Sequence, residues 1–188
     1  MLAGESYNAR DEELLAAAFR ARSLLSDFAS RPATDVVQRH AILEQLLGEA
    51  GEEIWIEPPF FCDYGMNIYI GSQTFVNANC VFLDAAEIRI GANSLIGPAV
   101  QLLTASHPLR AADRIVPMHK RATGRSPYNT HALPIRIGDN VWLGGGTIVL
   151  PGITIGDNAT IGAGSVVTKD IPADVLAFGN PCRVQRSL

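Results

Sequence analysis

IGDNVWLGGGTIVLPGITIGDNATIGAGSVV, residues 137–167, carries an aliphatic side chain at every sixth position. These positions are Ile137, Leu143, Val149, Ile155, Ile161 and Val167. A period of six fits neither the 3.6 of an α-helix nor the 2 of a simple strand. Three steps make eighteen residues, so a coil with three flat faces would stack each aliphatic side chain on its copy in the next coil. Because Gly, Asn and Asp favour tight corners and no single coil buries its own face, the stretch predicts a solenoid of short strands.

An earlier run keeps this pattern with a longer step. Its apolar positions recur twenty residues apart, in the pairs Ile70 and Ile90, Val76 and Ile96, and Phe82 and Leu102. Two extra residues must therefore lie within residues 83–87, and we expect them to project from a corner as a small loop. From residue 104 to residue 134 the period stops, and then it resumes. A segment of this length inside a compact domain is usually functional or disordered.

Two amphipathic helices are predicted before the solenoid. The first covers about residues 11–30, with acidic side chains at its N-terminus, where the helix dipole favours them. The second covers about residues 35–47 and ends before Gly48. We therefore expect an N-terminal helical segment, residues 1–53, that covers the open end of the solenoid. A β domain at 54–188 follows, with an extended loop at 104–134 and a C-terminal tail at 168–188.

The composition restricts the class of function. The chain has 188 residues, of which 47% are hydrophobic, and a formal net charge of −4, so it can bury a core and lacks the basic character of a nucleic-acid-binding protein. It has no apolar run of about 18 residues and no signal-like N-terminus, so we expect a cytoplasmic protein without a membrane segment. Its three cysteines, Cys62, Cys80 and Cys182, are expected to be reduced thiols rather than partners in a disulfide.

His107 lies where the period breaks and the long loop leaves the solenoid. A general base at the root of a loop on a rigid scaffold is a sensible catalytic arrangement. An imidazole can accept a hydroxyl proton near neutral pH. The alternative is a turn histidine that only hydrogen-bonds to the backbone.

Segments spread over nearly the whole chain match one family. The most specific is Thr104-Ala-Ser-His-Pro108, beside the Thr-Ala-Thr-His-Pro of that family. The others are MLAGESY (1–7), WIEPPF (55–60), CDYG (62–65), IGDNVWLGGG (137–146), IGAGSVVTKD (161–170) and GNPCRV (179–184). In these segments the chain resembles the maltose, galactoside and Nod-factor group of sugar O-acetyltransferases, which are hexapeptide-repeat acyltransferases. The resemblance implies an all-β fold, a left-handed parallel β-helix, and a homotrimer whose active sites lie between subunits.

The same resemblance implies a reaction. An acetyl group would pass directly from acetyl-CoA to a hydroxyl of a sugar or saccharide, with no metal involved. His107 matches the family base, and Gly145 matches the position whose backbone N–H stabilises the oxyanion. Asn77 matches an active-site asparagine that positions the acceptor and the thioester. For Gly145 and Asn77 the alternative is ordinary corner geometry.

Further positions are implied for the two substrates. Those matching the acceptor site are Asp63, Phe75 and Asp84, and those matching the CoA site are Trp142, Gly145, Ala163, Thr168, Lys169, Arg183 and Arg186. Carboxylates would hold sugar hydroxyls through charge-assisted hydrogen bonds, and the cations would meet the phosphates of CoA. The alternatives are solvated turn carboxylates and ordinary surface cations.

Two departures from the family pattern concern the acceptor. Asn8 and Ala9 stand where an acidic residue is expected, and the loop from His107 to Pro134 is longer than expected by roughly ten residues. Its basic residues are Arg110, Arg114, His119, Lys120, Arg121 and Arg125. The loop either admits a larger or anionic acceptor or is a flexible lid with no role in specificity.

Three other functions stay open at this point. One is a hexapeptide acetyltransferase that acts on serine, an amino sugar or an antibiotic, and another is a catalytically silent β-helix used for scaffolding or binding. The third is metal chemistry, because the γ-class carbonic anhydrases are also β-helices. Their histidine ligands are closely spaced, whereas His40, His107, His119 and His131 are scattered, so we expect no metal site.

Overall fold

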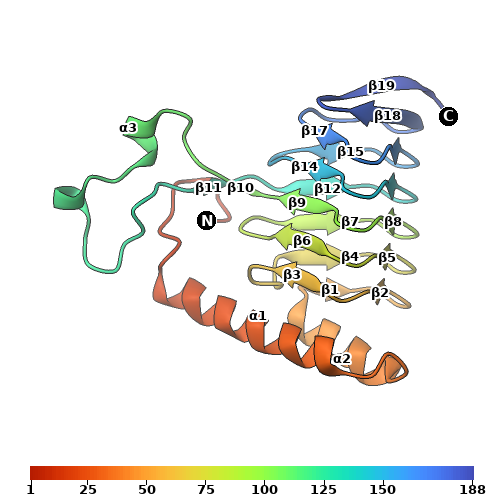
Figure 1. Cartoon of the computed structure of the whole chain (residues 1–188), viewed down its shortest axis with the longest axis horizontal. Helices are drawn as coiled ribbons and strands as arrows, with labels where there is room; N and C mark the ends of the chain where they lie inside the picture. The colour runs from red at the N-terminus through yellow and green to blue at the C-terminus, as the bar shows by residue number, and fades with distance from the viewer.

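In the computed structural model, which describes residues 1–188, the chain winds into a β-helix of about six turns (Figure 1). The first face contains β1 (Glu49–Ala50), β4 (Ile68–Ile70), β7 (Ile88–Ile90), β12 (Ile135–Ile137) and β15 (Thr154–Ile155). The second contains β2 (Trp55–Ile56), β5 (Phe75–Val76), β8 (Leu95–Ile96), β13 (Trp142–Leu143), β16 (Thr160–Ile161), β18 (Val175–Gly179) and β19 (Cys182–Ser187). The third contains β3 (Phe60–Cys62), β6 (Cys80–Leu83), β9 (Gln101–Leu103), β14 (Ile148–Val149) and β17 (Val166–Val167). The predicted left-handed parallel β-helix is confirmed.

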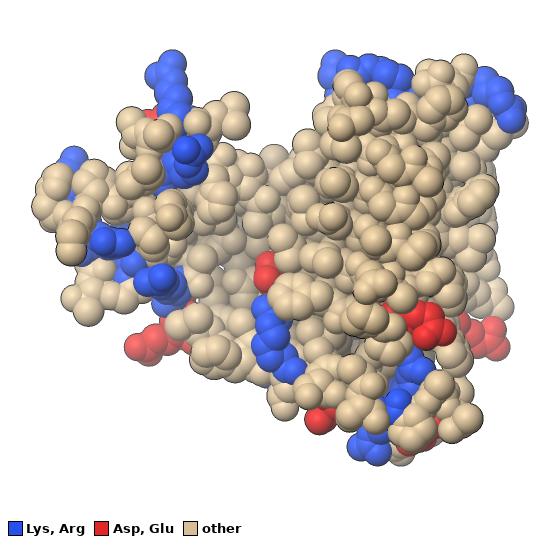
Figure 2. Space-filling view, in the orientation of Figure 1, with Lys and Arg blue, Asp and Glu red and all other residues tan.

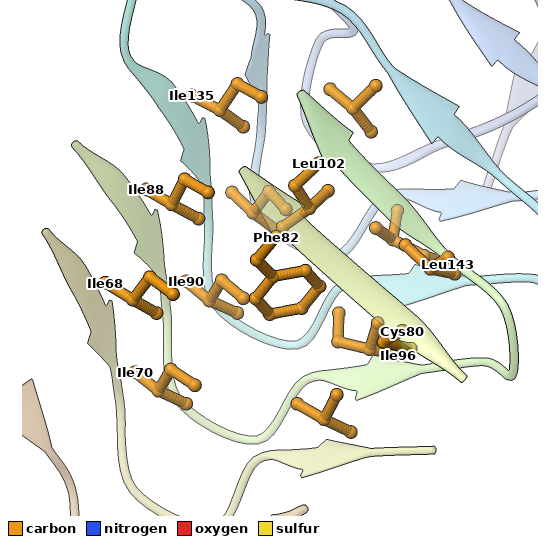
Figure 3. Packing of buried hydrophobic residues seen from close by; sticks show 14 of the residues in the cluster. Ile68, Ile70, Cys80, Phe82, Ile88, Ile90, Ile96, Leu102, Ile135 and Leu143 are labelled. Carbon is orange, nitrogen blue, oxygen red and sulfur yellow. The ribbon is translucent and has the colours of Figure 1, made fainter. Parts of the chain in front are cut away.

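The six-residue period determines the register between coils. Ile137 pairs with Ile155 and Leu143 with Ile161, each in parallel strands and each eighteen residues apart. All four of these side chains are buried. Figure 3 shows other members of the same core, among them Leu102, which with Leu143 is completely buried. In the early coils Phe82 packs edge-to-face on Phe60, with ring centroids 5.2 Å apart.

The asparagines of the repeats form the corners between the first and second faces. Asn93, Asn140 and Asn158 have φ angles of 55°, 57° and 59°, in the left-handed region that asparagine tolerates better than most residues. The Asn140 side-chain amide donates to Asn158 Oδ1 at 3.0 Å, and Asn158 donates to Asp174 Oδ1 at 2.8 Å. Stacked corners therefore satisfy each other's polar groups.

Two helices cover the N-terminal end of the β-helix. They are α1 (Glu12–Ser30), capped by Asp11, and α2 (Val36–Leu46), capped by Asp35, within a residue of the ends expected from the sequence. Arg39 ties α2 to the first coil by donating to the Ile56 carbonyl at 3.0 Å. Neither helix combines the length and apolar character that a membrane crossing requires. The first strand begins at Glu49, so the β-helix starts inside the segment 1–53 that was expected to be helical.

The expected projecting loop at residues 83–87 is wrong. Asp84, Ala85 and Ala86 are 0%, 1% and 2% exposed. The corner folds inward because the Asp84 carboxylate accepts hydrogen bonds from backbone N–H groups of the corner beneath it. The extra residues thus add a second layer of packing beside the main core.

The long loop forms an ordered arm, residues 108–130, that projects from the third coil (Figure 1). Its root is an antiparallel pair, β10 (Ala105–Ser106) with β11 (His131–Ala132), and it carries α3 (Ala111–Arg114) and a 3₁₀ turn, Met118–Lys120. At the other end of the chain β18 and β19 form a hairpin that extends the second face. The three cysteines are free and buried.

Leu143→Ala removes a fully buried side chain from the middle of the stack. We expect it to lower the free energy of unfolding by about 2–5 kcal/mol, because a cavity remains in a packed core. Leu2→Ala, at a side chain that is 59% exposed, is the control and should change it by less than about 0.5 kcal/mol. Urea denaturation followed by circular dichroism measures both, and equal losses would contradict the stacked core.

Candidate active site

His107 is held in one tautomer by the returning segment of the arm, residues 126–130. Its Nδ1 lies 2.9 Å from the Asn129 carbonyl oxygen. A carbonyl only accepts, so Nδ1 carries the proton and Nε2 keeps its lone pair. The side chain is exposed, and the Tyr128 ring lies edge-on with centroids 6.2 Å apart. His107 therefore does hydrogen-bond to the backbone, as expected of a simple turn histidine. The same hydrogen bond keeps the proton on Nδ1 and leaves the lone pair of Nε2 free to accept another.

The N-terminal segment is hydrogen-bonded to residues 126–130, the segment of the arm that orients His107. Tyr7 N–H donates to the Thr130 carbonyl at 3.0 Å. Asn8 Oδ1 accepts from Ser126 N–H at 2.9 Å, so the residue that departs from the family pattern connects the N-terminus to the arm. Burial, aided by the charge of Asp63, raises the pKa of the Tyr7 phenol to about 12.

Two corners between the third and first faces stack beneath the corner that carries His107. We call the whole column of corners between these two faces the His107 edge. Asp84, in the middle corner, accepts from the backbone N–H groups of Asp63 at 3.0 Å and Tyr64 at 2.9 Å. Thr104, in the corner above, accepts from Ala86 N–H at 2.9 Å and donates to a backbone carbonyl below. The predicted acceptor residue Asp84 is therefore fully buried and organises the corners that carry Asp63 and His107.

Asp63 is the accessible carboxylate of the His107 edge. Its side chain is 31% exposed and lies 3.9 Å from the Arg22 guanidinium. Arg22 also donates to the Asp63 carbonyl at 3.2 Å and stacks on the Phe61 ring. Burial raises the pKa of Asp63, and the positive charge of Arg22 opposes this rise. This carboxylate can accept hydrogen bonds from hydroxyl groups brought to the surface.

The corners between the second and third faces form a separate column, the Gly145 edge, which contains Asn77, Gly145 and Ala163. Neither Gly145 N–H nor Ala163 N–H donates a hydrogen bond within the chain, whereas Gly146 N–H bonds to the Pro98 carbonyl at 2.8 Å. Asn77 Oδ1 accepts from Ala78 N–H at 2.7 Å, and its Nδ2 has no partner in the chain. Free amide donors therefore line this edge.

Close packing leaves no room for a side chain at two glycines of the Gly145 edge. A Cβ atom added to Gly97 would lie 2.6 Å from Gly145 N, and one added to Gly144 would lie 2.5 Å from Ala163 N. Glycine at these two positions lets successive corners approach and leaves their amides accessible to a ligand. These glycines are therefore needed for ordinary corner geometry. They also leave the backbone N–H groups of Gly145 and Ala163 without a partner in the chain.

The remaining predicted residues flank these two edges. Phe75 is half-buried and Trp142 is 54% exposed on the outer side of the second face, next to the Gly145 edge. Arg183 and Arg186 lie exposed on β19 at the C-terminal end of the same face, and Thr168 and Lys169 follow β17 at the His107 edge. The cations therefore lie at the C-terminal end of the solenoid, with Lys169 on the His107 edge and the two arginines on the second face.

One chain does not bring the two groups together. A face spans about six residues from corner to corner, which at about 3.3 Å per extended residue is on the order of 20 Å. His107 and Asp63 lie at one border of the third face, and Asn77, Gly145 and Ala163 lie at the other. A catalytic centre that uses both groups needs a second chain.

Several contributors to the site were missed in the sequence. Asn129 orients His107 through a backbone carbonyl, and Arg22 reaches the Cys62–Asp63 corner from α1. Neither contact has a sequence signal, because one uses a backbone atom and the other spans forty residues. No group of three or more His, Cys, Asp or Glu side chains is arranged to hold a metal ion.

Comparison with known proteins identifies two family models in the chain. Residues 1–51 match the maltose acetyltransferase hexapeptide capping motif. Residues 134–169 match the bacterial transferase hexapeptide, with six repeats.

Relatives match the full length. Nodulation protein L of Rhizobium meliloti is 48% identical over 185 residues, covering 98% of this chain and 95% of that protein. Galactoside O-acetyltransferase of Escherichia coli is 38% identical over 186 residues, covering 99% and 86%. A maltose O-acetyltransferase structure from Clostridium difficile superposes with a TM-score of 0.91, 44% identity and coverage of 100% and 94%. A hexapeptide-repeat acetyltransferase of Vibrio cholerae, solved with acetyl coenzyme A, gives a TM-score of 0.88, 38% identity and coverage of 100% and 96%.

The buried Asp84 carboxyl makes stability depend on pH. Burial is the main cause that raises its pKa from 3.8 to about 6, against the opposing effect of the amides of Tyr64 and Asn67. The folded state then binds more protons than the unfolded state between about pH 4 and pH 6, so the contribution of Asp84 to stability falls as pH rises through this window. A shift of about two units corresponds to roughly 3 kcal/mol.

We therefore expect the free energy of unfolding of the wild type to decline relative to that of Asp84→Asn between pH 4 and pH 7. Urea titrations of both proteins at each pH measure the difference, and Asp84→Asn is the matched control because it lacks the titrating carboxyl. A difference that grows with pH would mean that the three backbone donors outweigh burial.

Proposed function

The chain belongs to the sugar O-acetyltransferases of the hexapeptide-repeat family, and we propose that it moves an acetyl group from acetyl-CoA to a saccharide hydroxyl with His107 as general base. The observation that carries this proposal is the hydrogen bond between His107 Nδ1 and the Asn129 carbonyl, which leaves Nε2 able to accept a proton. Acetyl-CoA as donor is supported by the relative solved with that molecule. A saccharide acceptor is supported by the maltose and galactoside enzymes among the relatives.

The reaction is a direct transfer. His107 Nε2 takes the proton of the acceptor hydroxyl while the hydroxyl oxygen attacks the thioester carbonyl carbon, forming a C–O bond. The C–S bond then breaks, and the departing CoA sulfur receives the proton held on Nε2. General base catalysis of this kind contributes about 10²–10⁴-fold to the rate.

The Gly145 edge supplies hydrogen bonds to the reacting groups. Its Gly145 N–H has no partner in the chain and is suited to the oxyanion that forms on the thioester carbonyl. Asn77 Nδ2 is similarly free to position the acceptor or the thioester. The unpaired Ala163 N–H, one coil further on, would bond to the pantetheine arm, with Trp142 beside it.

The two substrates approach from opposite ends of the coil stack. Hydrogen-bond donors that suit the phosphates of CoA lie at the C-terminal end, on Thr168, Lys169, Arg183 and Arg186. Asp63 and Phe75 belong to the first two coils, where a carboxylate and an aromatic face suit the hydroxyls and the apolar side of a sugar ring. Asp84 contributes by holding the Asp63 corner rather than by touching the sugar.

We propose that the working unit is a homotrimer with active sites between subunits. Two observations support assembly. His107 and Gly145 lie on opposite borders of the third face, so one chain lacks a complete centre. The arm also exposes apolar side chains in the isolated chain, with Leu109 94% and Met118 82% accessible, and such side chains are usually covered by a partner or a ligand.

Replacing His107 tests the base. We expect His107→Ala to lower kcat for acetylation by about 10²–10⁴-fold, with a dissociation constant for CoA close to that of the wild type, because the CoA residues belong to other corners. Thiol release from acetyl-CoA with glucosides, galactosides, maltose, amino sugars and serine measures turnover, and calorimetry measures CoA binding. Unchanged turnover would refute the base assignment. Turnover only with serine, or acetylation of an amino sugar on its nitrogen, would refute the saccharide hydroxyl as acceptor.

Mixed trimers test the shared site. His107→Ala removes the base, and Ala163→Trp blocks the CoA corner, so each variant alone should be inactive. Chains co-expressed in equal amounts should recover about one quarter of wild-type activity, because that fraction of interfaces pairs an intact His107 with an intact CoA corner of the other chain. Light scattering should give three times the chain mass of 20.2 kDa. An inactive mixture of confirmed mixed trimers would mean that both halves of a site come from one chain.

A further inference from the structure

The arm beside His107 is a strongly basic element in an acidic protein. Residues 108–130 contain five Lys or Arg side chains and one acidic residue, Asp113, which gives a formal charge of +4 in a chain whose net charge is −4. The rest of the chain therefore carries −8. Figure 2 shows these cations spread over the projecting arm, away from the surface of the coils.

One of the five cations has a structural role and four do not. The Arg114 guanidinium donates to the carbonyls of Pro108 at 3.2 Å and Leu109 at 3.1 Å, so it holds α3 to the turn after His107. The other four make no side-chain hydrogen bond and no ion pair within the chain, and we call them the loop cations. They are Arg110, Lys120, Arg121 and Arg125.

The loop cations stand on a frame that is fixed to the base. Asn129 accepts the His107 hydrogen bond, donates its backbone N–H to the Arg114 carbonyl at 2.8 Å and donates its side-chain amide to the Asp113 carbonyl at 2.7 Å. Asn8 holds the returning segment of the arm by accepting a hydrogen bond from Ser126 N–H. An acceptor whose hydroxyl lies at His107 Nε2 therefore meets the arm in a defined position, which a freely moving lid would not provide.

We propose that the loop cations bind the anionic groups of the acceptor, so that the preferred substrate is an acidic saccharide bearing carboxylate or phosphate groups. This proposal rests on the acetyl transfer proposed above. The acidic remainder of the chain repels such a molecule, and the arm attracts it, so the field directs an anion to the side of the molecule that carries His107. Guanidinium groups also match carboxylate and phosphate oxygens in pairs, which gives the contact direction as well as charge.

Matched pairs of acceptors test the proposal on the full-length protein. Methyl glucuronide is compared with methyl glucoside, and a short oligogalacturonate with its methyl ester, which has the same length without the charge. We expect kcat/KM to be about tenfold or more higher for the acidic member of each pair at low ionic strength, and the advantage to shrink in about 0.5 M salt. This preference for acidic acceptors should be absent in the fourfold variant Arg110→Gln/Lys120→Gln/Arg121→Gln/Arg125→Gln.

Two controls separate a local contact from a general change in charge. Arg110→Lys/Arg121→Lys/Arg125→Lys retains every charge on the arm and should keep most of the preference. Arg136→Gln removes an exposed cation of β12 on the first face, away from the arm, and should leave the preference unchanged. Light scattering and circular dichroism verify the assembly and fold of each variant.

The proposal is overturned by equal kcat/KM values within each pair, or by a preference that survives neutralisation of the arm. It is also overturned if the fourfold variant no longer assembles while the wild-type preference is insensitive to salt, because the cations then serve contacts between subunits. Acetylation of the neutral members alone would leave the transferase intact and refute this inference. Turnover with no saccharide of any kind would refute the transferase proposal itself.

Discussion

Main-chain hydrogen bonding between successive coils is the constraint on which the rest of this molecule depends. Once a strand pairs with its copy eighteen or twenty residues away, every corner lies directly above the corner before it. Side chains at equivalent positions then form columns along the solenoid. The residues that we propose for the active site fall into two such columns, and their separation is the width of a face, which no side-chain rotation can overcome.

The same constraint determines where chemistry can be added. A corner tolerates an insertion because it lies between strands, whereas an insertion within a strand would shift the inward register of the core. This chain inserts residues at one corner in three successive coils. The insertions at 63–67 and 84–87 turn inward and join through the Asp84 carboxylate, and the third, above them, becomes the arm with His107 at its root.

Much of this architecture could be predicted from the sequence, for reasons that lie in the repeats. The aliphatic period predicted the core from Ile137 to Val167. Acidic side chains located the start of the first helix, and Gly48 located the end of the second. The inward fold of the corner at Asp84 could not be predicted. An Asp in a two-residue insertion gives the same sequence pattern whether its carboxylate faces solvent or accepts from three backbone amides. The partner of His107 was equally hidden, since a carbonyl oxygen belongs to every residue and only the fold selects Asn129. Contacts of side chains with distant backbone atoms leave no periodic trace.

These geometric limits make the two parts of the proposed site, the Gly145 edge and the arm, differ in how freely their residues can change. The donors of the Gly145 edge are backbone amides on close-packed corners, and a methyl group at Gly97 or Gly144 would collide with the next corner. That part of the proposed site suits a constant thioester, because its backbone has little freedom to adapt to different acceptors. The arm lies outside the stack, so its side chains can vary without disturbing the register of any coil. In the mechanism that we propose, charge on the arm is therefore free to select an acceptor, while the coils hold the reacting groups in place.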